Sequence, residues 1–205
     1  MKSPFCRVIT FVDWDSAFRI FPGRGKRAPS REKKQDILEA LDLLTKEISH
    51  YLMKQSERNE SYRVMWRVYH GWYRGKTKMP ERREFEGAIA EFSSRAIGKK
   101  IAITNDFKYG DEPLCDTKRK PLYDTLRGGQ GRIDSQKMVD TALICDLLHA
   151  IRYNEADIGI VIGDDDDLIP GLITAEAWKG RVAMLHRRTT TNPHLNTKGL
   201  LYAMR

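Results

Sequence analysis

The fold of this chain is predicted most directly by the stretch Ile158-Gly-Ile-Val-Ile-Gly163, which runs into Asp164-Asp-Asp-Asp167 and then Leu168-Ile-Pro170. A short apolar run rich in β-branched residues is typical of a strand buried on both faces of a parallel sheet. The four acids begin where this strand should end, and open α/β sheets bind their ligands beyond the carboxyl ends of their strands. The stretch therefore predicts either a functional site at this edge or a solvated acidic loop that caps the following helix.

Two further segments bring acidic side chains to the same edge. The run Val8–Val12 is also typical of a buried strand and is followed by Asp13 and Asp15. Asp140 stands in the first turn of a predicted helix. Because the carboxyl ends of parallel strands meet at one edge of a sheet, we expect these acids and those of residues 164–167 to lie together.

Strand and helix patterns alternate along the chain. Strand patterns lie at residues 8–12, 62–69, 101–104, 158–162 and 181–185, and helical patterns lie at residues 30–57, 84–97, 141–149 and 168–178. Residues from about 105 to 135 show no period and are predicted to form a long basic loop, which is usually functional when it is this long. The order predicts one three-layer, Rossmann-like α/β domain over residues 1–205, with a mainly parallel five-stranded sheet and another short element in the tail.

The charge balance points to a polyanionic partner. The formal net charge is +8 although the chain carries a conspicuous acidic run, so basic side chains must gather elsewhere on the surface. Nucleic acid is the commonest partner of such a surface, and the alternative is a merely soluble basic protein.

Three cysteines match no metal-ligand spacing and are interpreted as reduced thiols. No apolar segment approaches membrane-spanning length, so we expect a cytoplasmic protein without a membrane partner.

Basic and aromatic side chains in loops are the candidates for nucleic-acid contact. Aromatic rings beside Arg and Lys at a strand end suit stacking on unpaired bases together with phosphate contact, although the same rings could complete a core. The candidates are Arg24, Lys26, Arg27, Trp72, Arg74, Lys76, Lys118, Arg119, Lys120 and Lys137.

The chemistry of the acids predicts a metal site. Ligation by oxygen alone, with no His or Cys partner, favours Mg²⁺ or Mn²⁺ over zinc. A hard cation held by carboxylates beside a basic groove suits hydrolysis of phosphodiester bonds.

Three motifs, taken together, resemble those of a known family. They are Phe11-Val-Asp-Trp-Asp-Ser16, Lys137-Met-Val-Asp140 with Asp146 six residues later, and Gly163-Asp-Asp-Asp-Asp-Leu-Ile-Pro170. In this order they resemble the NYN domains of the PIN-like nuclease superfamily, over nearly the whole chain. The resemblance implies a PIN-like fold and a metal-dependent endoribonuclease. Asp146 lies on another face of its helix from Asp140, where we expect a supporting or structural role.

The resemblance also implies which acids act. Asp13 and Asp140 match two metal-binding acids of the family, and Asp165 and Asp167 match its acid pair when they are counted back from Pro170. These four are the candidate catalytic residues and, with Asp164, the candidate metal ligands. The chain departs from the family where Asp164 replaces Gly, Gly163 replaces Ser and Ser16 replaces a frequent Asn, which bears on the metal geometry.

Two other functions fit some of the same residues. In a phosphatase that resembles the haloacid dehalogenases, Asp13 would be the nucleophile, Asp15 the acid, and Thr104 would close a second strand. No cap element is recognisable for that function, and Asp140 would have no role in it. The other alternative is a non-catalytic RNA-binding module that keeps the fold. The exposed loops are equally compatible with a homodimer or another protein partner.

Overall fold

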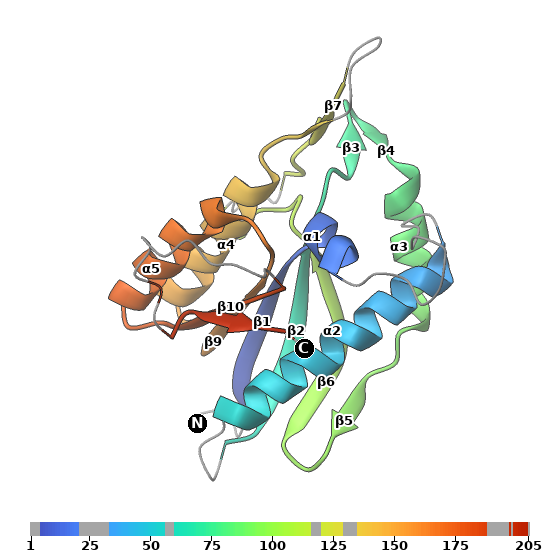
Figure 1. The fold of residues 1–205 in the computed structure, drawn as a ribbon. Helices are drawn as coiled ribbons and strands as arrows, with labels where there is room; N and C mark the ends of the chain where they lie inside the picture. The colour runs from blue at the N-terminus through green and yellow to red at the C-terminus, as the bar shows by residue number, and fades with distance from the viewer. Residues whose placement is uncertain are drawn as a thin grey trace.

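A computed structural model of the chain describes residues 5–20, 33–55, 60–115, 120–128, 135–187, 197 and 199–204 (Figure 1). Its main sheet has the strand order β11-β10-β9-β1-β2-β6-β5. Neighbouring strands are parallel except for β5 and β6, which are antiparallel. The bounds are β1 Cys6–Asp13, β2 Tyr62–Tyr69, β5 Arg95–Ile97, β6 Ile101–Tyr109, β9 Ile158–Ile162, β10 Arg181–His186 and β11 Leu201–Ala203.

The predicted α/β class and mainly parallel Rossmann-like sheet are confirmed, but the prediction of five strands is wrong. The sheet has seven strands among the described residues, because β5 and β11 extend its two edges. Each of these edge strands is only three residues long. Runs this short have no periodic pattern that sequence can reveal.

Helices cover both faces of the sheet, which gives three layers (Figure 1). Their bounds are α1 Trp14–Ile20, α2 Lys34–Gln55, α3 Pro80–Glu91, α4 Val139–Arg152 and α5 Ile169–Ala177, with a 3₁₀ turn, η1, at Asp166–Leu168. Apolar side chains of α1, α2 and α3 share one core with the sheet, and those of α4 and α5 share the other. No described helix has the length and apolar character needed to cross a membrane.

The central strand β1 supplies both cores by simple alternation. Val8 and Val12 belong to the core under α2, whereas Ile9 and Phe11 belong to the core under α4 and α5. Successive side chains of a strand point to opposite faces, so this pattern follows directly from the sequence. It fixes β1 in place with helices on both sides.

The helix predicted over residues 84–97 is wrong at its end. α3 ends at Glu91, because Phe92 has an extended backbone with φ −70° and ψ 116°. Phe92 still packs into the core, with its ring 5.3 Å from that of Phe107. Ile97 belongs to β5, and Gly98 follows β5 with φ +60°.

The long loop predicted at about 105–135 begins later than predicted, and two-residue strands interrupt it among the described residues. β6 continues through Tyr109, so Thr104 lies inside the strand and donates a hydrogen bond to Val64 O at 2.7 Å. Two small hairpins follow the ends of the main strands: β3 Tyr73–Arg74 with β4 Thr77–Lys78, and β7 Leu126–Arg127 with β8 Ser135–Gln136. We call the four strands together the arm. Figure 1 shows the arm at the top, beyond α1.

Hydrogen bonds join the two hairpins of the arm. Asp124 N donates to Gly75 O at 2.9 Å, and Gly75 N donates to Asp124 Oδ1 at 3.0 Å. Tyr73 N donates to Thr125 Oγ1 at 3.1 Å. Gly75 has φ +54°, a backbone conformation that favours glycine in such a turn. The arm is therefore one connected unit at its base.

Candidate functional site

Asp13 lies at the point where the order of the sheet reverses. β1 pairs with β2 on one side, the next main strand along the chain, and with β9 on the other, and Val12 is the register partner of Ile162. Such a reversal opens a crevice beyond the strand ends, where α/β proteins bind ligands. Gly163 follows β9 directly, and a Cβ at Gly163 would lie 3.8 Å from Asp13 Cβ. The ends of β1 and β9, each followed by acids, are therefore neighbours.

Asp13 is held firmly by the start of α1. It is only 5% exposed, its Oδ1 accepts a hydrogen bond from Asp15 N at 3.1 Å, and its Oδ2 accepts one from Ser16 Oγ. Ser16 is fully buried. Asp13 therefore caps α1 as well as pointing to the crevice, and Ser16 reaches it without an intervening water.

Asp140, in the first turn of α4, is electrostatically coupled to acids from the other segments. Its pKa is raised to about 6, by burial first and then by the negative charges of Asp13, Asp165, Asp167 and Asp15. Like charges raise a carboxyl pKa only when they are close, so these five side chains gather at one edge of the sheet. We call them the acidic cluster.

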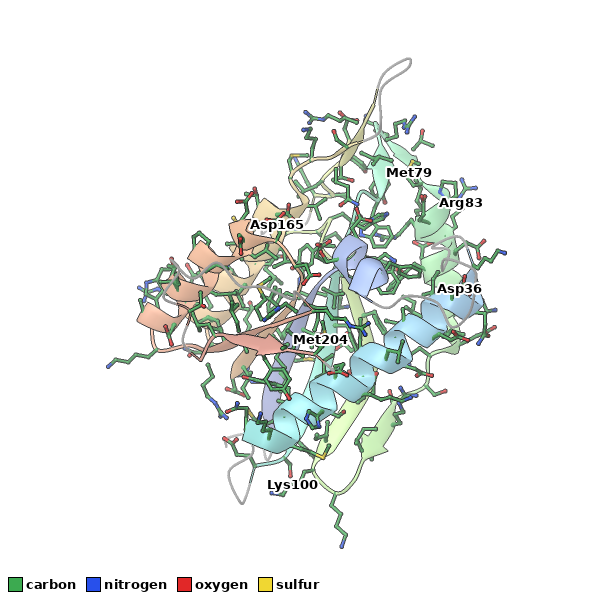
Figure 2. The ribbon with its side chains drawn as sticks, in the orientation of Figure 1. Asp36, Met79, Arg83, Lys100, Asp165 and Met204 are labelled. Carbon is green, nitrogen blue, oxygen red and sulfur yellow. The ribbon has the colours of Figure 1, made fainter. Side chains whose placement is uncertain are left out.

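The Asp164–Asp167 run also has the capping role that the sequence left open. Asp165 Oδ1 accepts a hydrogen bond from Asp167 N at 3.0 Å at the start of η1. Asp164 Oδ1 accepts one from Arg187 N at 3.0 Å, just after β10. Asp165 and Asp167 remain exposed, and Figure 2 labels Asp165 beside the ends of α4 and α5. A capping role and a functional role coexist in this run.

The donor chemistry of the acidic cluster fits a hard divalent cation, because all of its donors are carboxylate oxygens. A bound cation would also relieve the repulsion that raises the pKa of Asp140. In the part of the chain that the structure describes, no group of three or more His, Cys, Asp or Glu side chains is arranged to hold a metal ion. Asp13 and Asp165 make capping bonds instead. Metal binding would therefore need side chains of the cluster to turn toward one another.

Gln136 of β8 joins the arm to the acidic cluster. Its side-chain nitrogen donates a hydrogen bond to Asp15 Oδ2 and lies 2.8 Å from His70 Nδ1. A Cβ at Gly71 would lie 3.1 Å from Leu126 Cδ1 and 3.3 Å from Gln136 Cγ, so the arm packs closely against the segment after β2. Sequence reasoning missed Gln136 and His70, because neither residue type nor spacing sets them apart.

Asp146 has the structural role expected from its position on α4. It is fully buried, and its Oδ2 accepts hydrogen bonds from Arg67 Nη2 at 2.7 Å and from the Tyr69 hydroxyl at 2.8 Å. Its Oδ1 accepts one from Leu114 N at 2.7 Å. Burial raises the pKa of Tyr69, which therefore keeps its proton as a donor. The network anchors α4, and with it Asp140, to β2.

Trp72 is not available for stacking on bases. It is fully buried, with its ring 4.9 Å from that of His70, 5.5 Å from that of Phe85 and 5.9 Å from that of Tyr109. The prediction that Trp72 contacts nucleic acid is therefore wrong in this structure, and the core role is the correct one. The physical reason is that rings from several distant segments enclose the indole.

The basic candidates that the structure describes lie on the surface. Arg74 and Lys76 are exposed on the arm, Lys137 is exposed directly after β8, and Lys120 is exposed between β6 and β7. The other five candidates lie outside the described residues; they are Arg24, Lys26, Arg27, Lys118 and Arg119.

Thr104 does not lie where a haloacid-dehalogenase-like site would need it. Such a site places this hydroxyl at the carboxyl end of a strand, but β6 continues beyond Thr104 to Tyr109. The hydroxyl donates to the backbone of β2 instead. Both Asp13 oxygens accept hydrogen bonds from the start of α1, so the proposed nucleophile is also held as a cap.

Comparison of the chain with protein-family models, with curated proteins and with solved structures finds no match.

Proposed function

We propose that this protein is a metal-dependent endoribonuclease of the NYN type, with a PIN-like form of the Rossmann-like fold. The observation that carries the proposal is the coupling of Asp140 to four other carboxylates at the reversal point of the sheet. Acids gathered at a ligand-binding edge are costly for stability, and a function that uses a cation accounts for them.

The proposed ligands of Mg²⁺ or Mn²⁺ are Asp13, Asp140, Asp165 and Asp167, with Asp164 beside them. When bound, such an ion lowers the pKa of a water molecule and neutralises charge on the phosphoryl oxygens. Ser16 fixes the Asp13 carboxylate, and the bond from Arg187 N fixes Asp164. The role of these two contacts is to hold oxygens in place where RNA would be cut.

The proposed RNA contact runs along the arm. Arg74, Lys76 and Lys137 are exposed there, and the arm touches the acidic cluster through Gln136. Lys120, exposed between β6 and β7, is a further candidate for this contact. Phosphate contacts position a nucleic acid without reading its sequence, so these side chains would place the backbone near the acids. Arg24, Lys26, Arg27, Lys118 and Arg119 are further candidates for the same contact.

The test is cleavage of labelled RNA and of DNA with the same sequence, in Mn²⁺, in Mg²⁺ and in chelator. We expect cuts in RNA that need the metal and that Asp140→Asn reduces at least about 100-fold, because a ligand and its charge are lost. Asp166→Asn is the matched control, because Asp166 lies in the same acidic run but is not one of the proposed metal ligands. Its cleavage rate should stay within about twofold of the wild-type rate.

A non-catalytic RNA-binding module is the second candidate function. The observation that favours it is that the described acids are not assembled as a metal-ligand set. RNA binding with no cleavage in either metal would support the module and reject the nuclease. Cleavage that Asp140→Asn leaves unchanged would show that the activity comes from elsewhere.

A further inference from the structure

Two of the three cysteines lie in segments that are distant in the chain and meet in the fold. Cys115 follows β6, Cys145 lies on α4, and both are exposed. The residues next to them are hydrogen-bonded, because Leu114 N donates to Asp146 Oδ1 at 2.7 Å. Asp146 also accepts hydrogen bonds from Arg67 and Tyr69. These bonds hold α4 and the segment after β6 in place at this contact.

The electrostatics of Cys145 agree with this meeting of the two segments. The pKa of Cys145 is raised by burial first and then by Cys115 and Asp146. Cys115 therefore acts on Cys145 across the Leu114–Asp146 contact. Cys6 is separate, because the charges that act on it are Arg181, Asp157, Glu60 and Arg7.

We propose that Cys115 and Cys145 form a dithiol site that closes to an intramolecular disulfide when it reacts with a small disulfide such as oxidised glutathione. The Cys115 thiolate attacks one sulfur of oxidised glutathione. The glutathione S–S bond breaks, one glutathione thiolate leaves, and a mixed disulfide forms on Cys115. The Cys145 thiolate then attacks the Cys115 sulfur and displaces the second glutathione thiolate.

The reaction balances without another reagent. The two protein thiols release two protons and two electrons, and one oxidised glutathione becomes two reduced glutathione molecules. The product tethers the segment after β6 to α4 at the Leu114–Asp146 contact. The proposal does not depend on the nuclease function, because it concerns a surface thiol pair and not the acidic cluster.

The test uses the full chain equilibrated in glutathione buffers of decreasing reducing strength. Remaining thiols are then blocked with a maleimide, and the protein is digested and analysed by mass spectrometry. We expect one linked peptide pair that contains Cys115 and Cys145, with Cys6 still labelled by the maleimide. The oxidised protein should also have a higher midpoint of thermal unfolding, because the link constrains the unfolded chain.

Two variants make the result decisive. In Cys115→Ser, Cys145 has no partner and should retain one glutathione, with no rise in the unfolding midpoint. Cys6→Ser should form the same linked pair as the wild type. The proposal is overturned if the wild type carries separate glutathione groups on Cys115 and Cys145, if its links join two chains, or if both thiols stay reduced while Cys6 reacts.

Discussion

At the scale of single residues, the repulsion within the acidic cluster shows in the raised pKa of Asp140. Its pKa is about 6 in the folded protein, against an ordinary value of 3.8. The folded state therefore holds this proton more tightly than the unfolded chain does. The contribution to stability is fully present below about pH 4 and is lost as the pH rises through about 6.

Replacing Asp140 should remove this pH dependence. In chelator, Asp140→Asn should raise the free energy of unfolding at pH 7 by about 1–2 kcal/mol, after allowance for solvent screening of a half-buried group. Urea unfolding from pH 4 to pH 8 measures it. Asp166→Asn should keep the wild-type fall between pH 4 and pH 6. If the free energy of unfolding changes with pH equally in the wild type and in Asp140→Asn, the electrostatic coupling of Asp140 to the other acids is contradicted.

Trp72 shows what local sequence cannot tell about one side chain. Its neighbours Arg74 and Lys76 are exposed, as a nucleic-acid surface requires, yet the indole is fully buried. Its direction is set by Phe85 on α3 and Tyr109 on β6, which lie far from it in the chain. By contrast, Asp13 could be placed from sequence, because the end of an apolar strand marks its position.

At the scale of elements, the arm and the acidic cluster are mechanically connected. Gln136 bonds both Asp15 and His70, and the arm packs against Gly71. RNA bound on the arm would therefore act on the position of Asp15. Around a metal site, removing a side chain that hydrogen-bonds the groups near the ion typically changes metal affinity or activity by about 10- to 100-fold.

We expect Gln136→Ala to lower kcat for RNA cleavage about 10-fold while KM changes little, because the phosphate contacts of the arm remain. Steady-state kinetics at saturating Mn²⁺ measure both constants. Ser135→Ala is the control on the same strand, since Ser135 Oγ donates a hydrogen bond to Arg127 O within the arm. A raised KM with an unchanged kcat would mean that Gln136 contacts RNA and does not position Asp15.

Element boundaries were predicted well where a strand is buried and poorly at the edges. The prediction for residues 62–69 matches β2, because its alternating side chains have two cores to fill. The predicted helix ran past Glu91 because Phe92 and Ile97 continue the helical spacing by coincidence. Both residues are apolar for another reason: Phe92 packs on Phe107, and Ile97 lies in an edge strand.

At the scale of the whole molecule, the two ends of the sheet differ in the charged side chains that they carry. The carboxyl ends of the main strands carry the acidic cluster and the arm, whereas Lys99 and Lys100 lie at the turn between β5 and β6 at the other end (Figure 2). Because the net charge of +8 does not say which basic side chains bind RNA, basic residues at the two ends have to be substituted separately.

The double change Arg74→Ala with Lys76→Ala should weaken RNA binding and reduce the slope of log K against log salt by about 1–2, because two phosphate contacts are lost. Fluorescence anisotropy at several salt concentrations measures the slope. Lys99→Ala, at the opposite end, should leave the slope within about 0.3 of the wild-type value. Equal losses in both proteins would mean that RNA binds through general charge.

The topology was predictable because five runs of apolar residues alternate with helical patterns along the chain. The gathering of the acids was also predictable, since parallel strands end at one edge. The pairing of Gln136 with Asp15 and the contact of Leu114 with Asp146 were not, because each joins segments that only the folded chain brings together.

The position of β1 between two parallel neighbours has a consequence for chain length. Its register is fixed on both sides, so inserting or deleting one residue within 8–12 would exchange its two faces. Val12 would turn toward α4, and Asp13 would move away from Gly163. Conservative replacements of side chains in this strand are therefore tolerable, but a change in the count of its residues is not.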